Sequence, residues 1–173
     1  MQLVYEIFSS PLGELLVAGN DSAVIHVTQG KDKTLLAADF LFRYNARPAT
    51  KHDYVHKACM AITRYLEGKS AEMDIDFEID GTEFQCKVWD ALLKIPYGKT
   101  RSYSDIAHLI GKPGAFRAVA NACGDNPVPL LIPCHRVVHK SGNAVGFGWG
   151  KEAKYFLLNL EKKRSEASLA HAA

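Results

Sequence analysis

The sequence predicts a mixed α/β protein of the α+β class, in which a small sheet-and-helix domain precedes a mainly helical domain with a helix-turn-helix outline. Two observations predict this arrangement. Short runs rich in Val, Ile, Leu and Tyr, separated by turn residues, open the chain, whereas helical periodicity dominates after residue 82. A length of 173 residues with 47% hydrophobic residues is enough for one large core or two small ones.

The first 81 residues are expected to form the sheet-and-helix domain. Their short apolar runs alternate with turn residues such as Pro11 and Gly19, which is the pattern of an antiparallel meander. Residues 72–80 alternate acidic and apolar side chains, which predicts a further strand with one buried face and one acidic face that would point away from DNA. The expected strands are residues 3–8, 15–18, 23–27 and 72–80, and the expected helices are residues 32–43 and 53–67.

Gly81 marks the expected domain boundary, and a capping box of Thr82 and Gln85 begins a helix that ends at Pro96. Two more helices flank a glycine-bearing turn, which is the outline of a DNA-binding helix-turn-helix, although many helical hairpins share it. A proline-rich loop, a short strand, a Gly-rich loop and a last helix follow. In order, these elements are residues 84–95, 104–110, 111–114, 115–123, 124–133, 137–139, 142–150 and 152–163. The expected organisation is therefore domains 1–81 and 82–164 and a frayed tail, 165–173.

Composition excludes several classes of protein. No apolar run approaches the ~20 residues that a membrane span needs, and the first ten residues lack the basic start of a signal peptide, so a cytoplasmic location without a membrane partner is expected. The four cysteines contain no CxxC pair, which argues against a disulfide framework or a zinc finger. We expect neither a metal nor another cofactor, and we expect Cys59, Cys86 and Cys123 to be structural.

The net charge of +2 hides an asymmetry between the two halves of the chain. Residues 1–81 hold 8 Lys and Arg against 12 Asp and Glu, whereas residues 82–173 hold 13 against 7. A basic second half suggests a polyanion as its partner. The alternative is two differently charged surfaces with no partner, and charge does not decide between them.

The third helix of the second domain, residues 115–123, is mostly alanine. Arg117 and Asn121 are its long polar side chains, so it offers little base-edge readout. This composition predicts duplex DNA binding with weak sequence preference, led by backbone contacts and one inserted side chain, Arg117. The alternative is a packed core helix whose alanines contact a neighbour.

Cys134 is the cysteine best placed for chemistry, because His135 and Arg136 follow it and three prolines stiffen the preceding loop. The thiolate is the reactive form of cysteine, and both neighbours favour it electrostatically. Neighbouring side chains on a strand point in different directions, so His135 would accept the proton through a water. A carboxylate would orient the imidazole, and Glu161 is a candidate. Most neighbouring Cys and His residues are structural, so this pattern alone is weak.

The segment Pro133-Cys134-His135-Arg136-Val137-Val138, with Asn126-Pro127-Val128-Pro129 before it, resembles the O6-alkylguanine–DNA alkyltransferase family. The Arg117-Ala118-Val119 helix, the Tyr97-Gly98 and Ser102-Tyr103 pairs and residues 154–161 are similar to it as well. The resemblance covers about residues 82–161, and its Pro-Cys-His-Arg motif is highly specific. It implies a winged helix-turn-helix second domain and a ribonuclease H-like first domain, which matches the family only in outline.

The resemblance implies a monomeric repair protein that is used once. Cys134 would take the alkyl group from O6-alkylguanine in duplex DNA, with O4-alkylthymine as a second candidate, and the thioether would not turn over. The catalytic residues would be Cys134, His135 as base through a water, Glu161 as its orienting carboxylate, and Tyr103 as hydrogen-bond donor to the departing guanine. Arg117 would replace the nucleotide flipped out through the minor groove. The remaining substrate- and DNA-binding residues would be Asn126, Pro129, Arg136, Gly148 and Trp149.

Trp149 departs from the family pattern, because a small residue is usual at its position. Without the resemblance, Tyr103 is an ordinary aromatic at a helix start, Glu161 a surface partner of a nearby lysine, and Asn126 part of a turn. Two other functions stay open. One is a winged-helix binding protein with an inert cysteine, although family members that only sense damage carry Trp in place of the cysteine. The other is a cysteine hydrolase or redox enzyme, for which His139 and His171 are poor partners.

Overall fold

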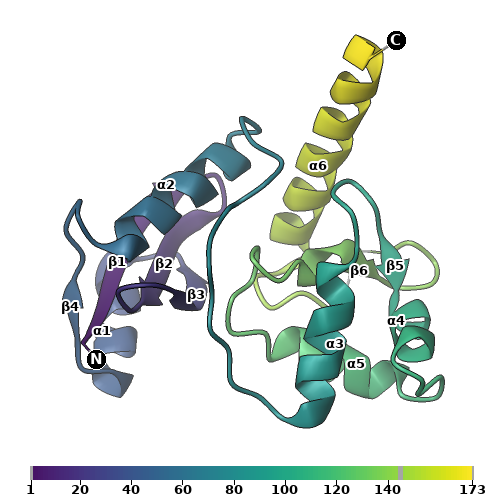
Figure 1. Ribbon diagram of the computed structural model, residues 1–173, viewed down its shortest axis with the longest axis horizontal. Helices are drawn as coiled ribbons and strands as arrows, with labels where there is room; N and C mark the ends of the chain where they lie inside the picture. Colours follow the sequence, from purple (N-terminus) through teal and green to yellow (C-terminus); the bar gives the residue numbers. More distant parts are fainter. Residues whose placement is uncertain (1, 144–145, 173) are drawn as a thin grey trace. The chain divides into compact units, whose positions relative to one another are not determined.

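The computed structural model describes residues 2–143 and 146–172 and divides the chain into two compact units, Met1–Ile79 and Asp80–Ala173 (Figure 1). The first unit contains a four-stranded sheet and two helices, and the second is mainly helical with a two-stranded sheet. This architecture confirms the predicted fold class. None of the helices in the described part of the chain has the length and apolar content to cross a bilayer.

The sheet of the first unit has the strand order β3-β2-β1-β4. The predicted meander is confirmed, because β1 pairs with β2 and β2 with β3 in antiparallel fashion. The fourth strand pairs in parallel with β1 and was not predicted, because three residues that include a proline carry no strand pattern. The strands are β1 (Leu3–Ser10), β2 (Gly13–Gly19), β3 (Val24–Gly30) and β4 (Ala46–Pro48).

Helices α1 (Lys33–Arg43) and α2 (Tyr54–Leu66) confirm the two predicted helices of this unit. The Asp32 side chain caps α1 by accepting a hydrogen bond from the Leu35 amide at 2.8 Å. On the α1 side of the sheet, Phe40 packs with Leu16 and Ala18. Both faces of β2 are buried, and α2 contacts β1 and β2. The central strand β2 is therefore buried between helices and forms the core of the first unit.

The predicted strand at residues 72–80 is wrong in extent. One isolated parallel bridge joins Phe77 to Val24, and the chain turns locally where the Ile75 amide donates to the Met73 carbonyl at 3.0 Å. The Asp76 amide donates a hydrogen bond to the Tyr54 hydroxyl at 2.6 Å. This amide is therefore not free to pair with the backbone of a neighbouring strand. Alternation of burial is nevertheless confirmed, with acidic side chains exposed between more buried apolar ones.

The first helix of the second unit begins at the predicted capping box, in which the Gln85 amide donates to Thr82 Oγ1 at 3.2 Å and the Thr82 amide donates to Gln85 Oε1 at 2.9 Å. A Cβ at Gly81 would lie 2.6 Å from the Trp89 ring, so this position needs glycine for close approach. Trp89 in turn donates to the Ala122 carbonyl at 2.8 Å, which ties the first helix to the third. The helices are α3 (Glu83–Leu93), α4 (Tyr103–Leu109), α5 (Phe116–Gly124) and α6 (Lys151–Ala172).

A short parallel pair, β5 (Arg101–Ser102) and β6 (Val137–Val138), joins the start of α4 to the segment that follows Cys134. A capping box of Ser102 and Asp105 sets Tyr103 as the first residue of α4. The fold thereby anchors the residues flanking Tyr103 and Cys134, which are 31 positions apart in the sequence, to one small sheet.

The expected frayed tail is wrong, because α6 continues to Ala172 and its last turns extend away from the rest of the second unit (Figure 1). Residues 165–172 contain Glu, Ala and Leu and neither Gly nor Pro, which is a composition that favours helix. The basic residues 162–164 therefore lie within the helix rather than at its C-terminus.

Candidate active site

Cys134 lies in a 3-10 turn, η1 (Cys134–Arg136), and not on the strand assumed from the sequence. Its side chain is 4% exposed. Asn126 Nδ2 donates to Cys134 Sγ at 3.2 Å and to the Ile132 carbonyl at 2.9 Å. Its Oδ1 accepts from the Val128 amide at 3.0 Å. Asn126 therefore fixes both the loop and the thiol.

The tight loop before Cys134 is held in an uncommon backbone conformation. Leu130 has φ of +78°, in the left-handed region that a non-glycine residue rarely adopts. Pro129 and Ile132 form an isolated bridge around it. The prolines and this bridge restrict the backbone conformation of the loop, so its predicted stiffness has a structural basis and stays a prediction.

His135 is buried, and its Nε2 lies 2.7 Å from Glu161 Oε1. A carboxylate can only accept, so Nε2 carries the proton and Nδ1 is the nitrogen through which proton exchange with the thiol would run. Glu161 is 1% exposed, which excludes the surface role that it would have without the family resemblance. The structure thus joins His135 and Glu161, 26 residues apart, as predicted.

Glu161 accepts further hydrogen bonds. Arg136 Nε and Nη2 donate to its carboxylate at 3.0–3.1 Å, and the Gly98 amide donates at 2.9 Å. Gly98 has φ of +72° and passes so close to Ser165 that a Cβ would lie 2.9 Å from that side chain. The glycine expected from the family pattern therefore lets the backbone reach Glu161.

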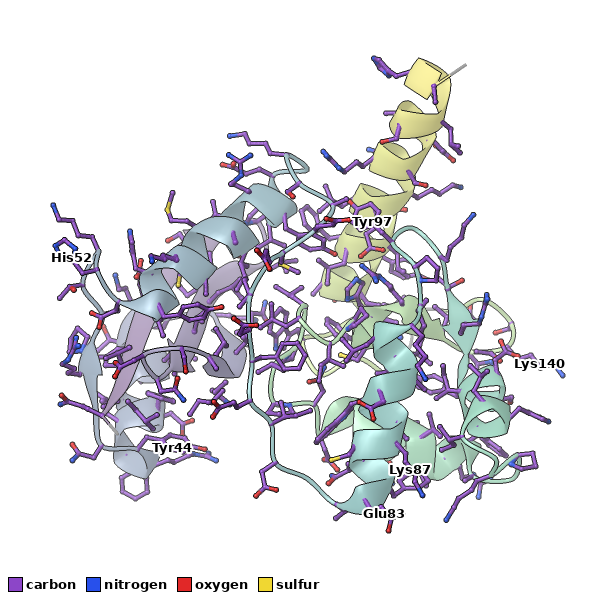
Figure 2. All side chains as sticks on the ribbon, in the orientation of Figure 1. Tyr44, His52, Glu83, Lys87, Tyr97 and Lys140 are labelled. Atoms are coloured by element: carbon purple, nitrogen blue, oxygen red, sulfur yellow. The ribbon has the colours of Figure 1, made fainter. Side chains whose placement is uncertain are left out.

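Arg136 does not have the position expected of a DNA-binding residue. Its Nη1 donates to the Ile95 carbonyl at 2.8 Å, and its guanidinium lies 5.6 Å from the centre of the Tyr97 ring, which Figure 2 labels. Charge-assisted hydrogen bonds to the buried carboxylate of Glu161 hold the guanidinium inward. Arg136 supports the His135–Glu161 pair instead.

These contacts set the protonation states. Burial lowers the pKa of His135, although the hydrogen bond with Glu161 opposes the shift, and the ring is neutral at pH 7. Burial alone would raise the pKa of Glu161, but hydrogen bonds from His135 and Arg136 outweigh it and lower the pKa to about 2. A neutral imidazole oriented by an ionised carboxylate is a competent proton acceptor.

Lys154 is a residue of the site that sequence reasoning missed. It is fully buried, its Nζ lies 3.5 Å from the Tyr103 hydroxyl, and it sits 5.7 Å from the centre of the Tyr103 ring. Its sequence signal was weak: Lys154, Leu157 and Glu161 share the buried face of α6 at helical spacing. The charge of Lys154 acts to lower the pKa of the Cys134 thiol, an effect that the sequence analysis assigned to His135 and Arg136.

Burial raises the pKa of the Cys134 thiol to about 11, although the Asn126 hydrogen bond and the charge of Lys154 oppose the shift. Burial also raises the pKa of Tyr103 to about 12, so the phenol keeps its proton and donates to the Gly146 carbonyl at 3.2 Å. The thiol is therefore mostly protonated at neutral pH and needs a base to react.

We expect Lys154→Met to slow alkylation of Cys134 by iodoacetamide at every pH from 7 to 10, a range that lies below the pKa of about 11 of the wild-type thiol. Loss of the buried cation raises the pKa of the thiol further. At a fixed pH below that pKa, the thiolate fraction falls about tenfold for each unit by which the pKa rises. Peptide mass mapping of Cys134 from pH 7 to 10 measures this. Lys163→Met, at an exposed position of α6, is the control, and identical profiles for both variants would contradict the assignment.

A cavity of about 450 Å³ lies beside Tyr103 and the start of α5. Arg117 lines it, as do Ser104, Phe116, Ala120, His139, Lys140 and Gly146. The Lys140 side chain points outward from the second unit (Figure 2). Pro129, Gly148 and Trp149 are not among the described residues that line it, so their predicted contact with a base remains a prediction. The Trp149 ring packs edge-on against the Phe147 ring, with 5.8 Å between the two ring centres.

All four cysteines lie within the described residues and are free thiols. Cys59 and Cys123 are buried, and burial raises the pKa of Cys123 to about 12. Within residues 2–143 and 146–172, no group of three or more His, Cys, Asp or Glu side chains is arranged to hold a metal ion. Cys134 differs from the other three because its neighbour His135 is joined to a buried carboxylate.

Comparison with known proteins agrees with this geometry. Residues 3–79 match the ribonuclease-like domain of 6-O-methylguanine DNA methyltransferase, and residues 83–163 match the DNA binding domain of the same family. A methylated-DNA–protein-cysteine methyltransferase of Methanosarcina barkeri is 38% identical over 162 residues, covering 92% of this chain and 98% of that protein.

Two solved structures from Mycobacterium tuberculosis are similar to the whole chain. O6-methylguanine methyltransferase is 37% identical with a TM-score of 0.82, covering 99% of this chain and 100% of that one. The second structure, a complex with DNA, is 39% identical with a TM-score of 0.82, covering 93% and 94%. Since both units match the two domains of one family and the relatives align over nearly their full length, the chain belongs to the 6-O-methylguanine DNA methyltransferase family.

Proposed function

We propose that this protein repairs DNA by moving the alkyl group of O6-alkylguanine in duplex DNA onto Cys134, once per molecule. The observation that carries the proposal is the buried Cys134 thiol, held by Asn126 at 3.2 Å and followed by a His135 that Glu161 binds at 2.7 Å. Membership of the methyltransferase family and the similarity to a relative solved with DNA support duplex DNA as the substrate.

The reaction begins with transfer of the Cys134 proton to His135 Nδ1 through a water. The thiolate attacks the alkyl carbon, a carbon–sulfur bond forms, and the carbon–oxygen bond breaks with its electron pair going to the guanine oxygen. Tyr103 donates a hydrogen bond to the guanine ring and stabilises the developing negative charge, and the departing guanine anion takes up one proton, which balances the proton that Cys134 gave to His135. The product is a thioether, which has no good leaving group, so the protein does not turn over.

The damaged nucleotide would leave the base stack to reach a thiol that is 4% exposed. Arg117 lines the cavity beside Tyr103, which supports its role as the side chain that occupies the vacated position. Among the exposed residues of α5, Arg117 and Asn121 have long polar side chains that could reach the edges of bases. Two such side chains distinguish few base pairs, which supports DNA binding with weak sequence preference. We propose a monomer that acts mainly on guanine, with O4-alkylthymine as a second substrate.

A stoichiometry experiment tests the function. Protein is mixed with an excess of duplex DNA that carries radiolabelled O6-methylguanine, and the label bound to protein is measured against time. We expect a plateau at one methyl group per chain with no further release of repaired DNA. Continued repair beyond one equivalent would identify a turnover enzyme, and no label on the protein would identify a binding protein.

A further inference from the structure

Phe116 is the first residue of α5 and is 44% exposed, which is unusual for a large aromatic side chain. It lines the 450 Å³ cavity together with Arg117, Ala120 and Tyr103. An aromatic ring at this place lies next to the side chain proposed to replace the flipped nucleotide. No step of the proposed reaction uses it.

The guanidinium of Arg117 lies 5.8 Å from the centre of the Phe116 ring. Adjacent residues on a helix point about 100° apart, so Arg117 folds back toward its neighbour rather than extending freely. Such a contact is a cation–π interaction. It joins the two side chains into one unit with a flat aromatic part and a charged part.

The surroundings favour DNA over a protein as the occupant of this surface. Arg117 and Lys140 place positive charge on the cavity, and His139 adds a third nitrogen-bearing side chain, while none of the described lining residues is acidic. Phosphates of a duplex complement this charge. An exposed aromatic ring beside a cationic side chain suits the flat face of a nucleobase, because every base can stack on an aromatic ring.

We propose that Phe116 is a second inserting side chain, which stacks on a base adjacent to the extruded nucleotide while Arg117 occupies the vacated position. This inference rests on the proposed function. Minor-groove proteins use apolar wedges of this kind to unstack base steps. In this chain, the ring would stabilise the opened duplex and take no part in the chemistry at Cys134.

The test compares Phe116→Ala with a matched control, Phe84→Ala. Phe84 lies in the first turn of α3 and also has a cation over its ring, Lys112 at 5.8 Å, but it does not line the cavity. The measured quantity is the second-order rate of Cys134 alkylation by O6-methylguanine in duplex DNA and by free O6-benzylguanine. We expect Phe116→Ala to lose about 10- to 100-fold on duplex DNA, the range that stacking on one base supplies, and to keep its rate on the free base.

Additional variants separate stacking from packing. Phe116→Trp should retain the duplex rate and Phe116→Leu should not, because leucine keeps apolar volume without an aromatic face. The double variant with Arg117→Ala should lose less than the product of the two single losses, since the side chains act as one unit. A duplex with 2-aminopurine beside the lesion should brighten less on binding the Phe116→Ala protein, because the neighbouring base is less unstacked.

Three outcomes would overturn the inference: an unchanged duplex rate for Phe116→Ala, an equal loss on duplex and free base, or a full duplex rate for Phe116→Leu. Each of these leaves the proposed function standing as long as wild-type protein still takes one methyl group from DNA. If wild-type protein takes none from either substrate, the proposed function fails instead, and the two failures are thereby distinguished.

Discussion

Replacing Cys134 by serine is expected to abolish alkyl transfer while leaving DNA binding nearly unchanged. A serine hydroxyl preserves the size of the side chain and can accept the Asn126 hydrogen bond, but it is a far weaker nucleophile than a thiolate. We expect the rate to fall on the order of 10⁶-fold, as when the nucleophile of a hydrolase is removed. The measurements are label transfer from methylated duplex DNA and binding of the same duplex by fluorescence anisotropy.

Cys86→Ser and Cys123→Ser are the controls, because they remove thiols that lack a buried His and Glu pair. Cys86 is half-buried on α3 and Cys123 is buried on α5. Both variants should keep the transfer reaction. Label on the Cys134→Ser protein, or loss of transfer in a control that still folds, would assign the chemistry to another thiol.

Glu161→Gln is expected to have the largest combined effect on stability and rate. The carboxylate is 1% exposed and accepts hydrogen bonds from His135, Arg136 and the Gly98 amide. Breaking a buried charge pair costs roughly 3–5 kcal/mol, because the partner charge loses its compensation. The imidazole also loses the group that fixes its tautomer, so alkyl transfer should slow by about 10²- to 10⁴-fold.

The pH dependence of unfolding gives a second readout of Glu161. Its folded-state pKa lies near 2, below the ordinary value of 4.5. This shift stabilises the fold above pH 4.5, and the stabilisation disappears as pH falls from 4.5 toward 2. Urea unfolding across this range should show a shallower pH dependence for Glu161→Gln than for wild type.

Glu166→Gln is the matched control, because Glu166 lies exposed on the same helix and contacts Lys162 at 4.0 Å. Exposed pairs of this kind contribute about 0–1 kcal/mol. The control should therefore unfold like wild type and transfer alkyl groups at the wild-type rate. Equal effects of the two substitutions would show that Glu161 does not hold His135 and Arg136 in the way described.

Much of the fold was predictable because local patterns and tertiary packing agree. The capping box at Thr82 and Gln85, the apolar spacing of α2 and the turn residues between the first strands are all local signals. The segment around residues 72–80 shows the limit of such signals. The alternation of acidic and apolar residues correctly predicts which side chains are buried. It does not predict whether this segment pairs with a neighbouring strand, because that depends on residues elsewhere in the chain, such as Tyr54.

The site was predictable in its residues but not in its geometry. The sequence identified Cys134, His135 and Glu161, yet a strand was assumed where a 3-10 turn exists, and Arg136 was assigned to DNA. The first difference is one of backbone conformation, whereas the direction of the Arg136 side chain depends on a network closed by α6, 25 residues further along the chain. Lys154 was missed for the same reason, because nothing in its neighbours shows that its ammonium reaches Tyr103.

The central claim is that Cys134 itself receives the alkyl group from DNA, and peptide mass spectrometry after reaction tests it most directly. Wild-type protein is incubated with duplex DNA that contains one O6-methylguanine, digested and mapped across all four cysteines. We expect the peptide with Cys134 to carry one methyl group in place of one hydrogen, with Cys59, Cys86 and Cys123 unmodified. A methyl group on another residue, or an unmodified Cys134 after the DNA has been repaired, would contradict the account.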